Sequence, residues 1–141
     1  MYRVCFAFVL SLAAPFAVAQ ASDAFSGKYS AITARAPDQS SVLQLTHRGG
    51  NAYAIDLQIV APNATRHTGH IQGEGLREGD TITLVKENRI PETGKIDHPP
   101  QCVLTLRVAG SVATVLSEKG CAAHHGAAAS FVEQGAKLIR D

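Results

Sequence analysis

The stretch Tyr53-Ala54-Ile55-Asp56-Leu57-Gln58-Ile59 decides the fold of this chain. Four large apolar residues alternate in it with three small or polar ones, which is the period of a β-strand with one face buried and the other in water. Slipping the pairing of this strand by one residue would turn Asp56 into the core, so we expect its register to be firmly set. It is the clearest strand in the sequence.

The same alternation recurs on both sides of this strand, with Gly, Asn, Asp or Pro interrupting it at short intervals, as is typical of an all-β domain. Residues 127–139 can be read as a strand or as a short helix. We expect a strand with a bulge, since Gly135 would cost a helix about 1 kcal/mol relative to alanine. The pattern predicts about eight antiparallel strands in a small barrel filled by side chains, with a two-sheet sandwich as the alternative. The other expected strands cover residues 25–31, 43–46, 65–74, 80–86, 102–107 and 111–116.

One segment, residues 88–101 (NRIPETGKIDHPPQ), contains three prolines and no apolar period, so we expect a long loop there. A proline-stiffened loop loses little entropy on binding, and loops on a rigid scaffold often carry function. Its apolar residues have no obvious core to enter. Residues 121–126 form a second candidate surface. The candidate binding residues of the first loop are Arg89, Ile90, Ile96 and His98.

Residues 1–21 have the order of a secretory signal peptide. Arg3 supplies an early positive charge, residues 4–14 are apolar except for one serine, Pro15 follows, and small residues lie at 17–21. The apolar stretch is short for a bilayer span, and no second one follows it. We therefore expect cleavage, a periplasmic or secreted protein without a stable membrane anchor, and a single domain over residues 22–141.

The composition argues against nucleic acid as a partner. Thirteen Lys and Arg face twelve Asp and Glu in the whole chain, and without Arg3 the two counts are equal. A surface of zero net charge gives no electrostatic footprint for nucleic acid or anionic lipid. With no tryptophan and few aromatic residues after the signal, stacking platforms for bases are hard to build.

Two cysteines, Cys102 and Cys121, remain after the signal. An even pair in an oxidising compartment predicts a disulfide, which would stabilise the domain by closing a loop. The alternative is a redox or metal-binding pair, but the two cysteines are far apart in the sequence and no Cys-x-x-Cys is present. We interpret the pair as structural.

No catalytic constellation can be assembled from the sequence, so we expect a protein that is not an enzyme and has no cofactor. There is no Gly-x-Ser-x-Gly elbow or Ser-x-x-Lys motif, and carboxylates occur singly beside turns. A metal site is the alternative for the histidines. Residues three apart on a strand point to opposite faces, so such a pair shares an ion only if the chain bends. The histidines concerned are His67, His70, His124 and His125.

The motif Ser26-Gly27-Lys28-Tyr29 resembles a Ser-Gly-x-Tyr motif carried by several periplasmic lysozyme inhibitors, which are small exported β-domains. The resemblance implies that Ser26 and Tyr29 offer hydroxyls to the catalytic carboxylates of a muramidase, with Lys28 adding a charge. In those families the motif usually lies later in the chain, whereas here it falls in the first expected strand. The alternative interpretation places Tyr29 in the core as an inward-facing strand residue.

These observations favour an exported, non-enzymatic binding protein with a protein partner. Its most concrete forms are an inhibitor of a cell-wall-degrading enzyme (a lysozyme) and an immunity protein against a toxin. A small-ligand or metal carrier and an envelope structural or assembly factor are the alternatives. The sequence leaves the oligomeric state open.

Overall fold

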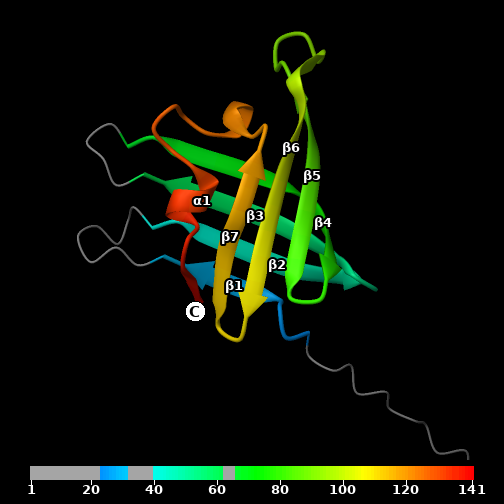
Figure 1. The fold of residues 1–141 in the computed structure, drawn as a ribbon, viewed down its shortest axis with the longest axis vertical. Coiled ribbons are helices and arrows are strands. Elements are labelled where there is room, and N and C mark those ends of the chain that lie inside the picture. Colours follow the sequence, from blue (N-terminus) through cyan, green and yellow to red (C-terminus); the bar gives the residue numbers. More distant parts are fainter. Residues whose placement is uncertain (1–22, 32–39, 62–65) are drawn as a thin grey trace, which may run out of the picture.

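The computed structural model describes residues 23–31, 40–61 and 66–141, and it shows one closed barrel of antiparallel strands in sequence order (Figure 1). The predicted all-β fold is therefore confirmed, and of the two architectures considered it is the barrel. The expected signal peptide lies outside the described residues. No helix in the described part of the chain is long and apolar enough to cross a membrane. The strands are β1 (Gly27–Ser30), β2 (Val42–Gly49), β3 (Ala52–Val60), β4 (Thr68–Glu78), β5 (Thr81–Arg89), β6 (Ile96–Ala109), β7 (Val112–Lys119) and β8 (Leu138–Arg140).

The strand predicted most clearly, β3, has the register expected from its sequence. Its four large apolar residues are each at most 2% exposed and form part of the barrel core. Asp56 faces outward and pairs with Gln44 of β2 on one side and Gln72 of β4 on the other. The alternation of apolar and polar residues thus fixes which face of β3 is buried.

Strand β4 starts and ends later than the expected strand over residues 65–74, and its glycines let core side chains approach it closely. It pairs with β3 from Thr68 to Leu76, but with β5 only from Gly75 to Glu78. A Cβ atom on Gly75 would lie 2.7 Å from Cδ1 of Ile55, so the missing side chain lets neighbouring core residues approach this strand closely. In Figure 1, β5, β6 and β7 cross in front of β1–β3, and β4 belongs to both groups of strands.

The expected strand over residues 127–139 is wrong for most of its length. Helix α1 (Phe131–Gln134) occupies its centre, and only Leu138–Arg140 form a strand. The backbone N–H of Glu133 donates to the Ser130 hydroxyl, which caps the helix. Gly135 lies at the C-cap of this helix, where glycine carries none of the cost that it has in a helix interior.

The ring closes where β8 pairs with β1 and β7. Arg140 lies at this seam and donates to the Tyr29 hydroxyl (2.8 Å) and to the Ser26 carbonyl oxygen (2.9 Å). The Tyr29 side chain is fully buried and forms part of the same core as β3. The first and last described strands are therefore joined by side chains as well as by the backbone ladder.

Candidate functional site

The candidate site is the end of the β5–β6 hairpin, which projects beyond the other strands (Figure 1). Strands β5 and β6 pair as far as Arg89 and Ile96. On the outer edge of β5 the pairing with β4 stops at Leu84, and on the outer edge of β6 the pairing with β7 stops at Val103. Beyond those points β5 and β6 pair only with each other among the strands of the described part of the chain.

The predicted long loop over residues 88–101 is wrong, because most of it is strand. Only residues 90–95 connect β5 to β6. The segment His98-Pro99-Pro100 belongs to β6, but β7 does not reach it, and a register shift also leaves residues 97–100 without a partner in β5. Proline cannot donate a ladder hydrogen bond, so it is tolerated in a strand at such an edge. Sequence reasoning took the prolines as loop residues because it could not show that this edge is unpaired.

The connection at the tip is braced by hydrogen bonds within the hairpin. The N–H of Ile90 donates to the carbonyl oxygen of Lys95 (2.9 Å), and the N–H of Gly94 donates back to Ile90 (2.8 Å). Arg89 donates to the Gly94 carbonyl oxygen (2.8 Å) and forms an ion pair with Glu87 (2.5 Å). These contacts hold the tip in one conformation, so a partner would order little of it on binding.

The four candidate residues of the hairpin differ in their surroundings. Ile96 is 51% exposed and His98 is also exposed. Ile90 is half-buried, and the guanidinium of Arg89 is already used to brace the tip. Ile96 and His98 are therefore the members of this set whose side chains are open to a partner.

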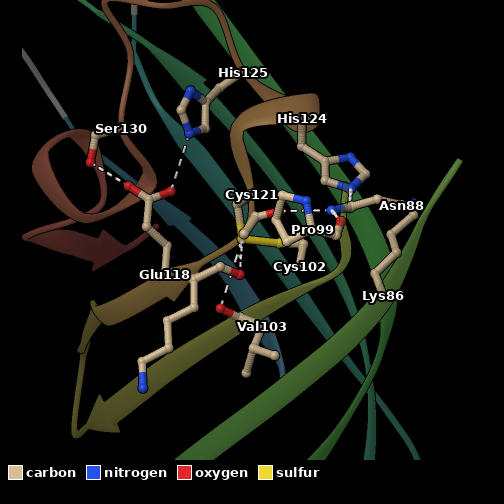
Figure 2. Close-up of a disulfide and its surroundings, with 12 residues drawn as sticks. Lys86, Asn88, Pro99, Cys102, Val103, Glu118, Cys121, His124, His125 and Ser130 are labelled. Carbon is tan, nitrogen blue, oxygen red and sulfur yellow. Dashed lines mark hydrogen bonds and ion pairs between the residues drawn. A yellow bond between two sulfur atoms is a disulfide. The ribbon is translucent and has the colours of Figure 1, made fainter. Parts of the chain in front are cut away.

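A buried asparagine fixes the base of the hairpin (Figure 2). Asn88 is only 1% exposed, and its amide nitrogen donates to the carbonyl oxygens of Pro99 (2.7 Å) and Gly120 (2.8 Å). Because that nitrogen is the donor of both bonds, the Asn88 side-chain oxygen accepts from Nε2 of His124 (2.9 Å). One side chain thus connects β5, β6 and the segment that follows β7.

The predicted disulfide is confirmed and lies beside Asn88 (Figure 2). Cys102 of β6 and Cys121 are both buried. The bond ties residues 121–126 to the strand from which the hairpin extends. This segment, the second candidate surface, contains the 3₁₀ helix η2 (Ala122–His124) and bridges to β4 between Gly69 and His125.

The His124 imidazole has a pKa below its usual value of 6.5. Burial is the main cause, because it disfavours the charged ring. The positive charges of Lys86, His125 and His70 lower the pKa further. The neutral ring, which donates to Asn88, is therefore the form that the folded protein favours.

We expect this shift to make the fold less stable in acid. The unfolded chain binds a proton at His124 near pH 6.5 and the folded chain only at lower pH, so the free energy of unfolding falls as the pH drops below about 6.5. Above that pH His124 does not make the free energy of unfolding depend on pH. Urea unfolding between pH 7.5 and 5 should show a steeper loss for the wild type than for His124→Gln, whose amide can still donate to Asn88. If the free energy of unfolding falls equally with pH in the wild type and in His124→Gln, the lowered pKa of His124 is contradicted.

The structure places the motif Ser26-Gly27-Lys28-Tyr29 at the start of the barrel. The Tyr29 hydroxyl donates to the Phe25 carbonyl oxygen (2.9 Å) and accepts from Arg140. Ser26 donates its hydroxyl to Asp23 (2.7 Å), and Lys28 is exposed and pairs with Asp141 (3.0 Å). The core position of Tyr29 agrees with the alternative interpretation of this motif.

Asp23 organises the residues around this motif. Burial raises the pKa of its carboxyl group, but hydrogen bonds from the side chains of Ser26 and Tyr53 and from the backbone of Phe25 and Ser26 outweigh burial and leave the pKa below its usual value. Burial and the hydrogen bond to Asp23 raise the pKa of the Tyr53 phenol. These groups bind one another and form a structural network.

The four candidate histidines contact different groups. His70 pairs with Asp56 (2.9 Å), His124 with Asn88, and His125 with the largely buried Glu118 (3.4 Å). A Cβ on Gly126 would lie 2.6 Å from Nδ1 of His67, so that ring packs against the backbone of the second candidate surface. Within residues 23–31, 40–61 and 66–141, no three His, Cys, Asp or Glu side chains form a group able to hold a metal ion.

Comparisons of the sequence with family models and curated proteins, and of the fold with solved structures, find no match.

Sequence reasoning missed Asn88, which organises the base of the hairpin. A signal was present: the inward alternation that runs through Ile82 and Leu84 reaches Lys86 and then Asn88. A polar residue at an inward strand position needs buried hydrogen-bond partners. Its partners come from Pro99, Gly120 and His124, which only the folded chain brings together.

Proposed function

We propose that this chain is an exported, non-enzymatic binding protein that recognises a protein partner through the end of its β5–β6 hairpin. The observation that carries the proposal is the hairpin itself, which extends past the barrel and is braced at both tip and base. A preorganised segment loses little conformational entropy on association, so more of its contact energy appears as affinity.

The shape of the hairpin favours a concave partner. A two-stranded projection offers little area for a flat interface but can enter a cleft, where a few buried side chains supply most of the binding energy. Ile96 is a large apolar side chain exposed next to the tip, and it is a suitable anchor, while Val85 is exposed nearer the base of the hairpin. Lys95 and His98 are exposed on either side of it in the sequence and can contribute polar contacts at the rim.

The most concrete partner is a cell-wall-degrading enzyme such as a lysozyme, whose substrate cleft has the concave form that the hairpin requires. The choice rests on the hairpin and not on the motif Ser26-Gly27-Lys28-Tyr29, although that motif resembles the one carried by lysozyme inhibitors. Because Tyr29 is buried, we assign the contact in this chain to the hairpin. An immunity protein would use the same geometry against a toxin.

The test is inhibition of a panel of lysozymes of different structural types by the purified oxidised protein. Ile96→Asp should weaken inhibition at least about 30-fold, the loss expected for a central apolar anchor. Leu116→Asp is the matched control, because Leu116 is also exposed (46%) but lies on β7. Tyr29→Phe should leave inhibition unchanged.

One result would contradict the proposal, and another would narrow it. Equal weakening by Ile96→Asp and Leu116→Asp would show that the hairpin is not the contact. Absence of inhibition across the panel would remove the lysozyme inhibitor from the proposal and leave a toxin as the partner to test by the same pair of variants.

A further inference from the structure

A groove opens on the outer face of the barrel, over β2, β3 and β4. It has a volume of about 390 Å³, within the range of roughly 300–1,000 Å³ that small-molecule sites occupy. Three neighbouring strands form it, and its polar lining contrasts with the apolar interior beneath. The residues that carry the argument are Gln44, Thr46 and Arg48 of β2, Ala54 and Asp56 of β3, and Gln72 of β4.

The register of the three strands explains why this face is hollow. Ala54 lies directly between Thr46 and Glu74, and the next outward position of β3, Asp56, lies between Gln44 and Gln72. In the row formed by Thr46, Ala54 and Glu74, the central position therefore has the smallest side chain, and the side chains around it are longer. Because opposed side chains in a sheet stand side by side, the small Ala54 side chain leaves a hollow, and Thr46 of β2 lines it on one side.

The carboxylate of Asp56 is held in place within the groove. One of its oxygens accepts from Nε2 of His70 (2.9 Å) and the other from the amide of Gln72 (2.7 Å). A carboxylate has room for about four hydrogen bonds in all, and Asp56 is only half-buried. It can therefore accept another donor from a ligand without moving.

Arg48 supplies a cation that has no partner among the residues that the structure describes. It occupies the irregular position in the pairing of β2 with β3, between His47 and Gly49. Bulges of this kind redirect side chains. Its guanidinium makes no hydrogen bond or ion pair with the described residues, whereas Arg77, Arg89, Arg107 and Arg140 all do.

We propose that this groove binds a small organic carboxylate, with the carboxylate on Arg48 and a hydroxyl or amide N–H of the ligand on Asp56. The planar guanidinium matches a carboxylate in shape and charge. The fixed negative charge of Asp56 disfavours a multiply charged anion at the other end of the groove but favours a hydrogen-bond donor. Gln44 and Gln72 can offer further donors and acceptors between the two ends.

A sugar acid and a short peptide with a free carboxyl end both have this chemistry. We would titrate the ¹⁵N-labelled protein with glucuronate, with glucose and with the dipeptide Gly-Gly, following backbone amide shifts by NMR. We expect saturable shifts at Gln44, Arg48 and Gln72 with at least one of the two carboxylates, and at least tenfold weaker binding of glucose. Glucuronate alone would identify a sugar acid as the ligand, and Gly-Gly alone a peptide.

Arg48→Gln tests the assigned cation and retains hydrogen-bonding capacity. It should weaken binding of the carboxylate by about ten- to a hundredfold, as expected when a hydrogen bond to a charged group is lost. Lys137→Gln removes an exposed positive charge outside the groove and should have no effect. The proposal is overturned if neither carboxylate gives saturable shifts, if glucose binds as well as glucuronate, or if the two variants weaken binding equally.

Discussion

Replacing Cys102 and Cys121 together by alanine should lower the free energy of unfolding by about 3 kcal/mol. The disulfide joins residues 19 apart in the sequence, and the chain-entropy estimate for a loop of this size gives that figure. Both cysteines are buried, so the substitution also removes packed sulfur atoms from the core. The measurement is urea unfolding of the oxidised wild type and the double variant.

The functional consequence of the same change follows from the position of the bond. Without it, residues 121–126 are no longer tied to β6, and the carbonyl of Gly120 and the ring of His124 lose a fixed position relative to Asn88. The double variant should therefore show faster hydrogen exchange at the base of the hairpin as well as lower stability. A loss of less than about 1 kcal/mol would mean that packing alone holds this segment to β6.

Asn88→Ala should cost about 2–4 kcal/mol of stability, although it removes only one side chain. The substitution removes three hydrogen bonds at once, to the carbonyl oxygens of Pro99 and Gly120 and from the N–H of His124, all of them partly buried. A hydrogen bond contributes about 1 kcal/mol, and the cost rises where the group left behind is shielded from water. Urea unfolding measures the loss of stability.

Gln101→Ala is the matched control for this substitution, since Gln101 is an exposed residue of the same hairpin. It should change stability by no more than about 0.5 kcal/mol. If the proposed function is right, Asn88→Ala should also weaken inhibition at temperatures where the variant remains folded, because the hairpin is then less firmly oriented. If Asn88→Ala lowers the free energy of unfolding as little as Gln101→Ala does, water replaces the hydrogen bonds of the Asn88 amide at little cost.

The strands with a full apolar period could be predicted from the sequence, and those shaped by distant contacts could not. In β3, alternation alone set the strand and its register, because both neighbours bury the same face. In β4, inward-facing glycines look like weak strand residues until Ile55 and Leu84 are seen to occupy the space beside them. The capped helix α1 was missed because a four-residue helix has almost no period to read.

The segment proposed as a binding surface from the sequence was given the wrong structure. Residues 88–101 do contain the exposed surface around Ile96 and His98, yet they form a braced hairpin. The disulfide was predicted correctly because only two cysteines follow residue 21, and that count can be read from the sequence alone. The role of Asn88 and the hollow beside Ala54 depend on which residues lie across from them, and no local pattern contains that information.

The seam between β1 and β8 has a consequence for the order of folding events. Tyr29 and Arg140 are 111 residues apart in the sequence, yet they lie side by side in the ladder and share a hydrogen bond. Contacts between such distant residues form slowly, because most of the intervening chain must be ordered before they can meet. During synthesis, β1 emerges long before β8, so the ring stays open until nearly all of the described chain has left the ribosome.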